Sequence, residues 1–221
     1  LAGLALAAMA LGGIAISRYG AGVASDSVKY LAVAQNLLDG NGLFDHRGLP
    51  LLSWPPLYSM IVAGLKLATG LDVFVAGWYF NIFLLGLDLV LSGVIFQRVF
   101  LTKPLYAYLA TVFVFLSISS LRIHATIGSD AFYLTVTLLL LLVLDDYIQR
   151  RSYRAFACVV LLSALAPLLR YVGLALGVTA GVVIVIENRK SMRVLLRDGI
   201  VVGIFSIAPI FWWLVIHNIM T

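Results

Sequence analysis

Two acidic residues, each placed beside an apolar run, are the strongest candidates for chemistry in this chain of 221 residues. Asp26 lies in the polar segment 25–30, and Asp130 stands at the start of an apolar run. A positioned carboxylate can act as general base on a hydroxyl or an amine. A charged residue at the edge of a membrane span is a functional candidate because burying a charge in lipid is costly. The alternative for each is an N-terminal helix Asp that serves capping and the helix dipole.

Several basic residues could contact a phosphate. Lys29 lies one helical turn after Asp26 and could pair with it or bind a lipid phosphate, although an interfacial Lys that snorkels needs no function. Arg122 and His124 precede Asp130 by eight and six residues, and interface anchoring is the alternative for Arg122. Arg170, followed by Tyr171, interrupts an apolar stretch, and its guanidinium could bind a phosphate bidentately. The alternative for Arg170 is a turn residue at the membrane interface.

Two further acids have simpler interpretations. Asp88 lies inside an apolar run, where a buried carboxylate is expensive. We expect a structural hydrogen bond there, with a proton relay in a transporter as the alternative. Asp198 flanks a basic loop, and we expect it to be solvated.

The composition is that of a membrane protein. The chain is 62% hydrophobic and 11% charged, with a mean hydropathy of +1.07, whereas soluble domains carry about 25% charge. Recurrent apolar runs predict a polytopic, all-α transmembrane bundle forming a single domain over residues 1–221. The net charge of +5 lies mostly in short loops, where topology explains it, so nucleic acid is not an expected partner. The single cysteine, Cys158, excludes an internal disulfide and a cysteine-based metal site.

We expect about seven spans and an exterior loop at 17–76 that positions Asp26. The expected spans are 1–16, 77–97, 105–121, 131–144, 156–169, 172–186 and 199–216. Because the chain both begins and ends at apolar runs, we expect it to be a fragment of a longer protein.

Within the loop, 25–39 is predicted to form an amphipathic interfacial helix whose apolar stripe holds Leu31, Ala34 and Leu38. Residues 55–70 are ambiguous. The distribution of Lys and Arg favours a crossing, but Lys66 near the middle opposes it.

Five segments, taken in order, resemble the GT-C superfamily of membrane glycosyltransferases, in the branch of protein O-mannosyltransferases and aminoarabinose transferases. Asp-Ser-Val-Lys-Tyr-Leu-Ala at 26–32 is similar to the family's first-loop Asp-x-x-(Arg/Lys)-Tyr segment. The other four are Asn-Leu-Leu-Asp-Gly-Asn-Gly at 36–42, Trp-Pro-Pro-Leu-Tyr at 54–58, the acidic second-loop segment 126–130 and Leu-Arg-Tyr-Val-Gly at 169–173. Ser27 stands where family members often carry Glu, and the family's later helices and soluble domain have no counterpart here.

The resemblance implies a function and a set of roles. The chain would transfer a sugar from a polyprenyl-phosphate donor to a lipid, glycan or protein acceptor on the exterior face of a bacterial plasma membrane. Asp26 would be the base, and Asp130 would orient the acceptor or hold a divalent cation. Lys29, Arg122 and Arg170 would neutralise the leaving phosphate. The expected binding set is completed by Tyr30, Tyr58, His124 and Tyr171.

The resemblance also implies that 55–70 does not cross the membrane. The alternatives in function are a transporter that uses Asp88 and a non-catalytic membrane subunit that retains the fold.

Overall fold

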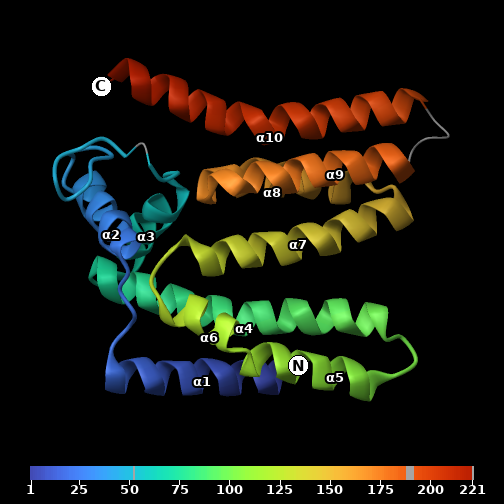
Figure 1. The fold of residues 1–221 in the computed structure, drawn as a ribbon, viewed down its shortest axis with the longest axis horizontal. Helices are drawn as coiled ribbons and strands as arrows, with labels where there is room; N and C mark the ends of the chain where they lie inside the picture. The colour runs from blue at the N-terminus through green and yellow to red at the C-terminus, as the bar shows by residue number, and fades with distance from the viewer. Residues whose placement is uncertain (52, 188–191, 221) are drawn as a thin grey trace. The chain divides into compact units, whose positions relative to one another are not determined.

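The described residues, 1–51, 53–187 and 192–220 of a computed structural model, form helices and no strand (Figure 1). This confirms the predicted all-α class. The chain divides into two compact units, and the expected single domain stays a prediction. Unit 1 comprises Leu1–Leu49 and Tyr58–Thr135, and unit 2 comprises Pro50–Leu57 and Val136–Thr221. One long helix, α7 (Ser129–Arg150), contributes its first residues to unit 1 and the rest to unit 2.

Unit 1 is built around the helix α4 (Val73–Val99), which packs against α1 and α5. Its other helices are α1 (Ala2–Tyr19), α2 (Ser25–Leu38), α3 (Leu57–Thr69), α5 (Pro104–Leu116) and α6 (Ile118–Ala125). The Asp72 carboxylate caps α4 by accepting a 2.8 Å hydrogen bond from the Phe74 backbone N–H. Ala8 of α1 packs with Leu85 and Leu89 of α4 in a buried cluster.

Unit 2 packs α10 (Met192–Met220) against α8 (Tyr153–Leu169) and α9 (Leu174–Glu187). A short 3₁₀ turn, η1 (Tyr171–Gly173), joins α8 to α9. The buried core consists of apolar side chains from α7 to α10, namely Leu140, Leu144, Tyr147, Val159, Ala180, Ile184 and Val202.

One carboxylate of unit 2 corrects the sequence-based expectation. Asp198 was expected to be solvated, but it is 1% exposed. It accepts hydrogen bonds from the Tyr147 hydroxyl at 2.5 Å and from Arg197 Nε at 2.6 Å. Position beside a basic loop did not reveal this, because the Tyr partner lies 51 residues away.

Among the described residues, four helices are long and apolar enough to cross a membrane: α1, α4, α7 and residues 197–215 of α10. The pair α5 and α6, bent by 54°, gives a fifth if it is one span. The stretches 153–169 and 171–187 are apolar but shorter. These helices are compatible with the predicted integral membrane protein, while the count of seven spans stays a prediction.

The helix at 25–39 is confirmed as α2, but the predicted stripe is shifted. Its buried residues are Ser27, Tyr30, Val33 and Ala34, whereas Leu31 and Leu38 are only half-buried. Hydropathy alone predicts that the leucines form the buried face of this helix. The actual buried face is set by the polar groups of Ser27 and Tyr30, which find partners elsewhere in unit 1.

The ambiguous segment 55–70 contains α3, which has 13 residues. At 1.5 Å per residue it is about 20 Å long, less than the roughly 30 Å of a hydrocarbon core. Lys66 donates a 2.8 Å hydrogen bond to Gln35 Oε1 of α2, so its charge is solvated by a polar partner. The short length of α3 and the hydrogen bond of Lys66 both favour a topology in which residues 55–70 do not cross the membrane.

A glycine beside η1 is required for packing in unit 2. A Cβ added at Gly173 would lie 2.2–2.6 Å from backbone atoms of Ala166 and Pro167. We expect Gly173→Ala to lower the free energy of unfolding by about 1–3 kcal/mol, because backbone atoms cannot give way as a flexible side chain would. Thermal unfolding in detergent measures the change.

Gly181→Ala is the matched control. It lies in the interior of α9, and a Cβ there meets nothing within 4 Å. Its melting temperature should stay equal or rise, since Ala favours a helix over Gly by about 1 kcal/mol. Equal melting temperatures for the two variants would contradict the packing.

Candidate functional site

The two predicted loop segments are bonded together through their backbones. Gly22 N–H donates to the Ala125 carbonyl at 2.8 Å, and Ile127 N–H donates to the Gly22 carbonyl at 3.0 Å. These bonds form an isolated parallel bridge between Gly22 and Thr126. A Cβ at Gly22 would lie 3.0 Å from Thr126 Oγ1, so the two chains approach closely. We call residues 22–30 and 125–130 the loop junction.

Two hydroxyls extend the junction toward the acidic residues. The Ser27 hydroxyl donates to the Ile127 carbonyl and accepts a 2.9 Å hydrogen bond from Ala24 N–H. The Tyr30 and Ser129 hydroxyls share a hydrogen bond of 3.0 Å. Ser27 directly follows Asp26, and Ser129 directly precedes Asp130. The junction therefore fixes the backbone beside both candidate carboxylates.

A buried pair of tyrosines, Tyr30 and Tyr58, packs beside the junction. The rings of Tyr30 and Tyr58 pack edge to face, with centroids 5.1 Å apart. Tyr58 donates a 3.4 Å hydrogen bond to Asn81 Oδ1, and Asn81 Nδ2 donates to the Thr126 carbonyl at 2.7 Å. Both tyrosine hydroxyls thus bond to protein groups. They hold the site in place here, and their expected contact with a substrate stays a prediction.

Sequence reasoning missed Asn81, which is 1% exposed and links α4 to the junction. The signal was available, because a polar amide inside the apolar run 77–97 needs a hydrogen-bond partner just as Asp88 does.

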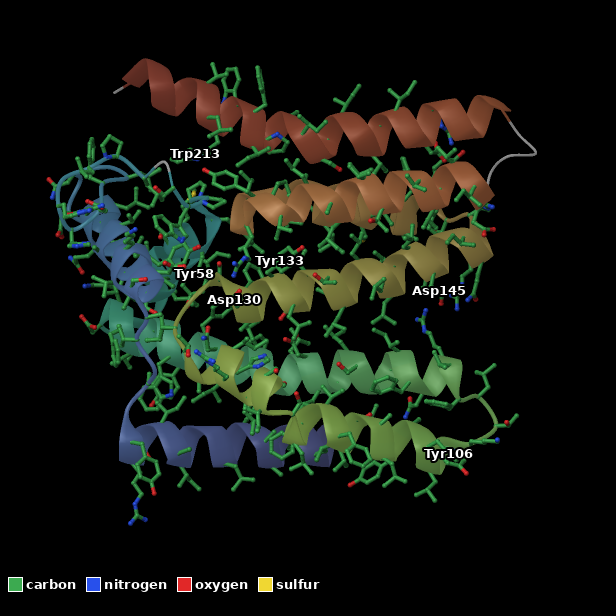
Figure 2. The ribbon with its side chains drawn as sticks, in the orientation of Figure 1. Tyr58, Tyr106, Asp130, Tyr133, Asp145 and Trp213 are labelled. Carbon is green, nitrogen blue, oxygen red and sulfur yellow. The ribbon has the colours of Figure 1, made fainter. Side chains whose placement is uncertain are left out.

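Besides Tyr30 and His124, four predicted site residues lie on or next to the loop junction. Asp26 is half-buried in the first turn of α2 and accepts a 3.3 Å hydrogen bond from the Ser25 hydroxyl. Lys29 occupies the next turn and is half-buried. Asp130 is exposed in the first turn of α7, and Arg122 is exposed near the end of α6. Figure 2 shows Asp130 and Tyr58 at the same end of unit 1.

His124 has a different place from the one predicted. It is 3% exposed, and its Nδ1 lies 2.8 Å from the Ser120 carbonyl. A carbonyl only accepts, so Nδ1 carries a hydrogen and donates it. Its Nε2 lies 3.0 Å from Asp88 Oδ2. Both ring nitrogens are engaged, so the predicted contact with a phosphate finds no free nitrogen. The turn of α6 aims the ring inward, which residue spacing did not reveal.

Asp88 has the structural partners expected for it. Its Oδ1 accepts a 2.6 Å hydrogen bond from the Thr135 hydroxyl, and its Oδ2 faces His124. His124 therefore uses Nδ1 for the Ser120 carbonyl and Nε2 for Asp88, so both side chains of the pair have hydrogen-bond partners.

Arg170 and Tyr171 belong to unit 2. Arg170 has extended backbone (φ −149°, ψ 138°) between α8 and η1, and its carbonyl accepts a 2.7 Å hydrogen bond from Gly173 N–H. This geometry is that of the turn residue named as its alternative. A contact of Arg170 or Tyr171 with a phosphate stays a prediction.

The described part of the chain contains no group of three or more His, Cys, Asp or Glu side chains arranged to hold a metal ion. The divalent cation that the resemblance allows stays a prediction, with Asp130 as its candidate ligand.

No family model, curated protein or solved structure matches this chain. The likeness to the GT-C superfamily therefore rests on the ordered sequence motifs.

The pair of Asp88 and His124 can be tested by a double-mutant cycle. We expect Asp88→Ala and His124→Ala each to lower the free energy of unfolding by about 3–5 kcal/mol, because each leaves a buried polar partner unpaired. The double variant should lose less than the sum, since the second change removes the group that the first left unpaired. Unfolding in mixed SDS micelles measures all three. Additive losses would mean that the two side chains do not interact.

Proposed function

We propose that this chain is the membrane part of a glycosyltransferase with the GT-C fold. It transfers a sugar from a polyprenyl-phosphate donor to a lipid, glycan or protein acceptor on the exterior face of a bacterial plasma membrane. The observation that carries the proposal is the loop junction, in which hydrogen bonds beside Asp26 and Asp130 tie the two acidic segments together.

Asp26 acts as the general base. The acceptor oxygen or nitrogen forms a bond to the anomeric carbon of the sugar, and Asp26 takes the acceptor's proton. The bond from the anomeric carbon to the phosphate oxygen breaks, and its electron pair leaves on the phosphate. The half-buried Asp26 suits this role because a base must reach the acceptor while being held in a fixed geometry. Asp130 orients the acceptor or holds a divalent cation.

Positive side chains stabilise the leaving phosphate. Lys29 lies within the loop junction and Arg122 close to it, so two cations of unit 1 accompany the two carboxylates. Fixed positive groups aimed at developing negative charge lower the barrier because they need no reorganisation during the reaction. Arg170 and Tyr171 belong to unit 2, and the motif at 169–173 alone proposes them as phosphate contacts.

The transporter alternative draws no support from the geometry of Asp88. A coupling carboxylate must exchange its proton or ion with water, whereas Asp88 is 3% exposed and both its oxygens have hydrogen-bond partners. A non-catalytic subunit is separated from an enzyme by the experiment below.

The direct test is Asp26→Asn, which preserves shape and removes the base. We expect transfer of radiolabelled sugar from polyprenyl phosphate in membranes to fall by about 10²-fold or more. Binding of polyprenyl phosphate to the purified variant should be retained, which would show that the fold is intact.

Asp39→Asn is the matched control. Asp39 is exposed at the other end of α2, about 20 Å away along the helix axis, and accepts a hydrogen bond from Gln35. Its transfer rate should equal that of the unmodified chain. Unchanged transfer in Asp26→Asn would reject the assignment of the base. If the unmodified chain binds the lipid but transfers no sugar, it is the non-catalytic subunit.

A further inference from the structure

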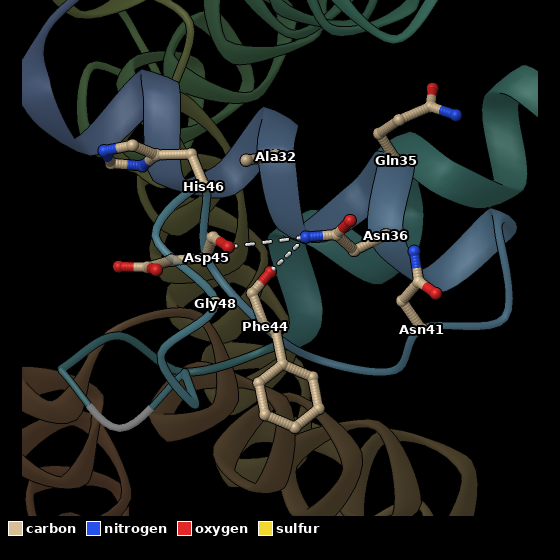
Figure 3. Close-up of a pocket in the computed structure, with 8 residues that line it drawn as sticks. All are labelled: Ala32, Gln35, Asn36, Asn41, Phe44, Asp45, His46 and Gly48. Atoms are coloured by element: carbon tan, nitrogen blue, oxygen red, sulfur yellow. Dashed lines mark hydrogen bonds between the residues drawn. The ribbon is translucent and has the colours of Figure 1, made fainter.

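A pocket of about 520 Å³ lies between the second half of α2 and the loop that follows it (Figure 3). Its volume is in the range of about 300–1,000 Å³ typical of small-molecule sites. Most of the lining side chains are polar: the residues are Ala32, Gln35, Asn36, Asn41, Phe44, Asp45, His46 and Gly48. All of them belong to unit 1. None is part of the loop junction or of the candidate site.

The loop wall is held by its own hydrogen bonds. Asn36 Nδ2 of α2 donates to the carbonyls of Phe44 at 2.8 Å and Asp45 at 3.4 Å. The backbone turns back on itself through Asp45 N–H to the Leu49 carbonyl at 2.8 Å and Gly48 N–H to the Asp45 carbonyl at 3.0 Å. Gly48 has φ +73°, which favours glycine at this turn. These hydrogen bonds hold the loop wall in one conformation. Less ordering is then needed when a ligand binds, which lowers the entropic cost of binding.

The one carboxylate of the lining is already satisfied. Asp45 accepts hydrogen bonds from the backbone N–H groups of Arg47 and Leu49, and from the Arg47 guanidinium at 3.0 and 3.2 Å. Burial raises the pKa of Asp45, but the hydrogen bonds from Arg47 and Leu49 outweigh it and lower the pKa to about 2. The carboxylate stays ionised at neutral pH and is paired with Arg47. No Lys or Arg lines the pocket, so it offers an anionic ligand no partner of opposite charge.

The groups left to meet a ligand are an amide and an imidazole. In the described residues no hydrogen bond engages the Asn41 amide or the His46 imidazole, and both side chains are exposed. Figure 3 shows Asn41 and His46 at opposite ends of the pocket with Asn36 between them, and the Phe44 ring pointing away from the amides. An amide and a neutral imidazole each donate and accept. A neutral ligand with neighbouring hydroxyl groups matches them, because each hydroxyl also donates and accepts hydrogen bonds.

We propose that this pocket binds a neutral, hydroxyl-rich saccharide, with Asn41 and His46 as its principal contacts. Asn36 follows Asp26 by ten residues, a rise of about 15 Å along α2. If the proposed sugar transfer holds, the bound unit is a part of the acceptor remote from the reacting end. The binding itself does not depend on transfer.

The test uses neutral trisaccharides as probes, namely mannotriose, maltotriose and chitotriose, added without any donor lipid to the purified chain in nanodiscs. Saturation-transfer NMR should show binding of at least one of them. Asn41→Ala combined with His46→Ala should raise its Kd about tenfold or more, because two hydrogen bonds are lost. Both side chains are exposed, so the fold is not at risk.

The control variants separate this site from other effects. Gln97→Ala removes an exposed amide at the far end of α4 and should leave the Kd unchanged. Asp26→Asn should also bind normally, so that a failure of the transfer proposal would not be mistaken for a failure of this one. Three results would overturn the inference: no binding of any of the probes, binding that the double variant leaves unaltered, or displacement of the saccharide by inorganic phosphate at equal concentration.

Discussion

The hydrogen-bonded junction between residues 22–30 and 125–130 is the interaction on which the rest of the account depends. Each of its bonds is worth only about 0.5–1.5 kcal/mol in net terms. Together they satisfy backbone groups at an irregular part of the chain, where helix bonds are not available and unpaired groups are costly. Because the bonds fall beside Asp26 and Asp130, satisfying the backbone also positions the two carboxylates.

The same demand, that buried polar groups be paired, explains the charged residues inside the bundle. In unit 1 the Asp88 carboxylate meets His124 and Thr135, and in unit 2 Asp198 meets Tyr147 and Arg197. Each network links helices that are distant in sequence. In a medium that cannot hydrogen-bond, such links restrict which helices can pack together. These carboxylates therefore support the fold, whereas Asp26 is half-buried and Asp130 is exposed.

The pocket beside α2 shows a different use of polar residues. There the carboxylate of Asp45 and the amide of Asn36 form hydrogen bonds with backbone groups of the loop and hold its shape. What remains exposed is an amide and an imidazole, those of Asn41 and His46. The helix α2 thus carries a candidate reactive residue at its start and a candidate recognition surface near its end.

Sequence alone predicted the helical class, the amphipathic helix α2 and the acidic segments, because hydropathy and local residue type determine these features. It did not predict the partners. The hydroxyls of Ser27 and Tyr30 bond to residues about a hundred positions away, and this shifted the buried face of α2 from the one that its leucines indicated. The burial of His124 and of Asp198 was not foreseen for the same reason, since position in the sequence does not reveal which way a side chain faces. The pocket was missed because it depends on how the loop folds back over Asn36.

The most direct test of the junction is a disulfide between positions 22 and 126 in a chain that also carries Cys158→Ser. A Cβ at Gly22 would lie 3.3 Å from Thr126 Cα, so the two backbones are as close as a disulfide requires, since its Cα atoms are about 4.4–6.8 Å apart. We expect Gly22→Cys with Thr126→Cys to cross-link readily on mild oxidation in membranes, while Gly22→Cys with Gly40→Cys, at opposite ends of α2, does not. A pair at 22 and 126 that stays reduced, or that reacts no faster than the control pair, would contradict the junction and the shared acidic site that depends on it.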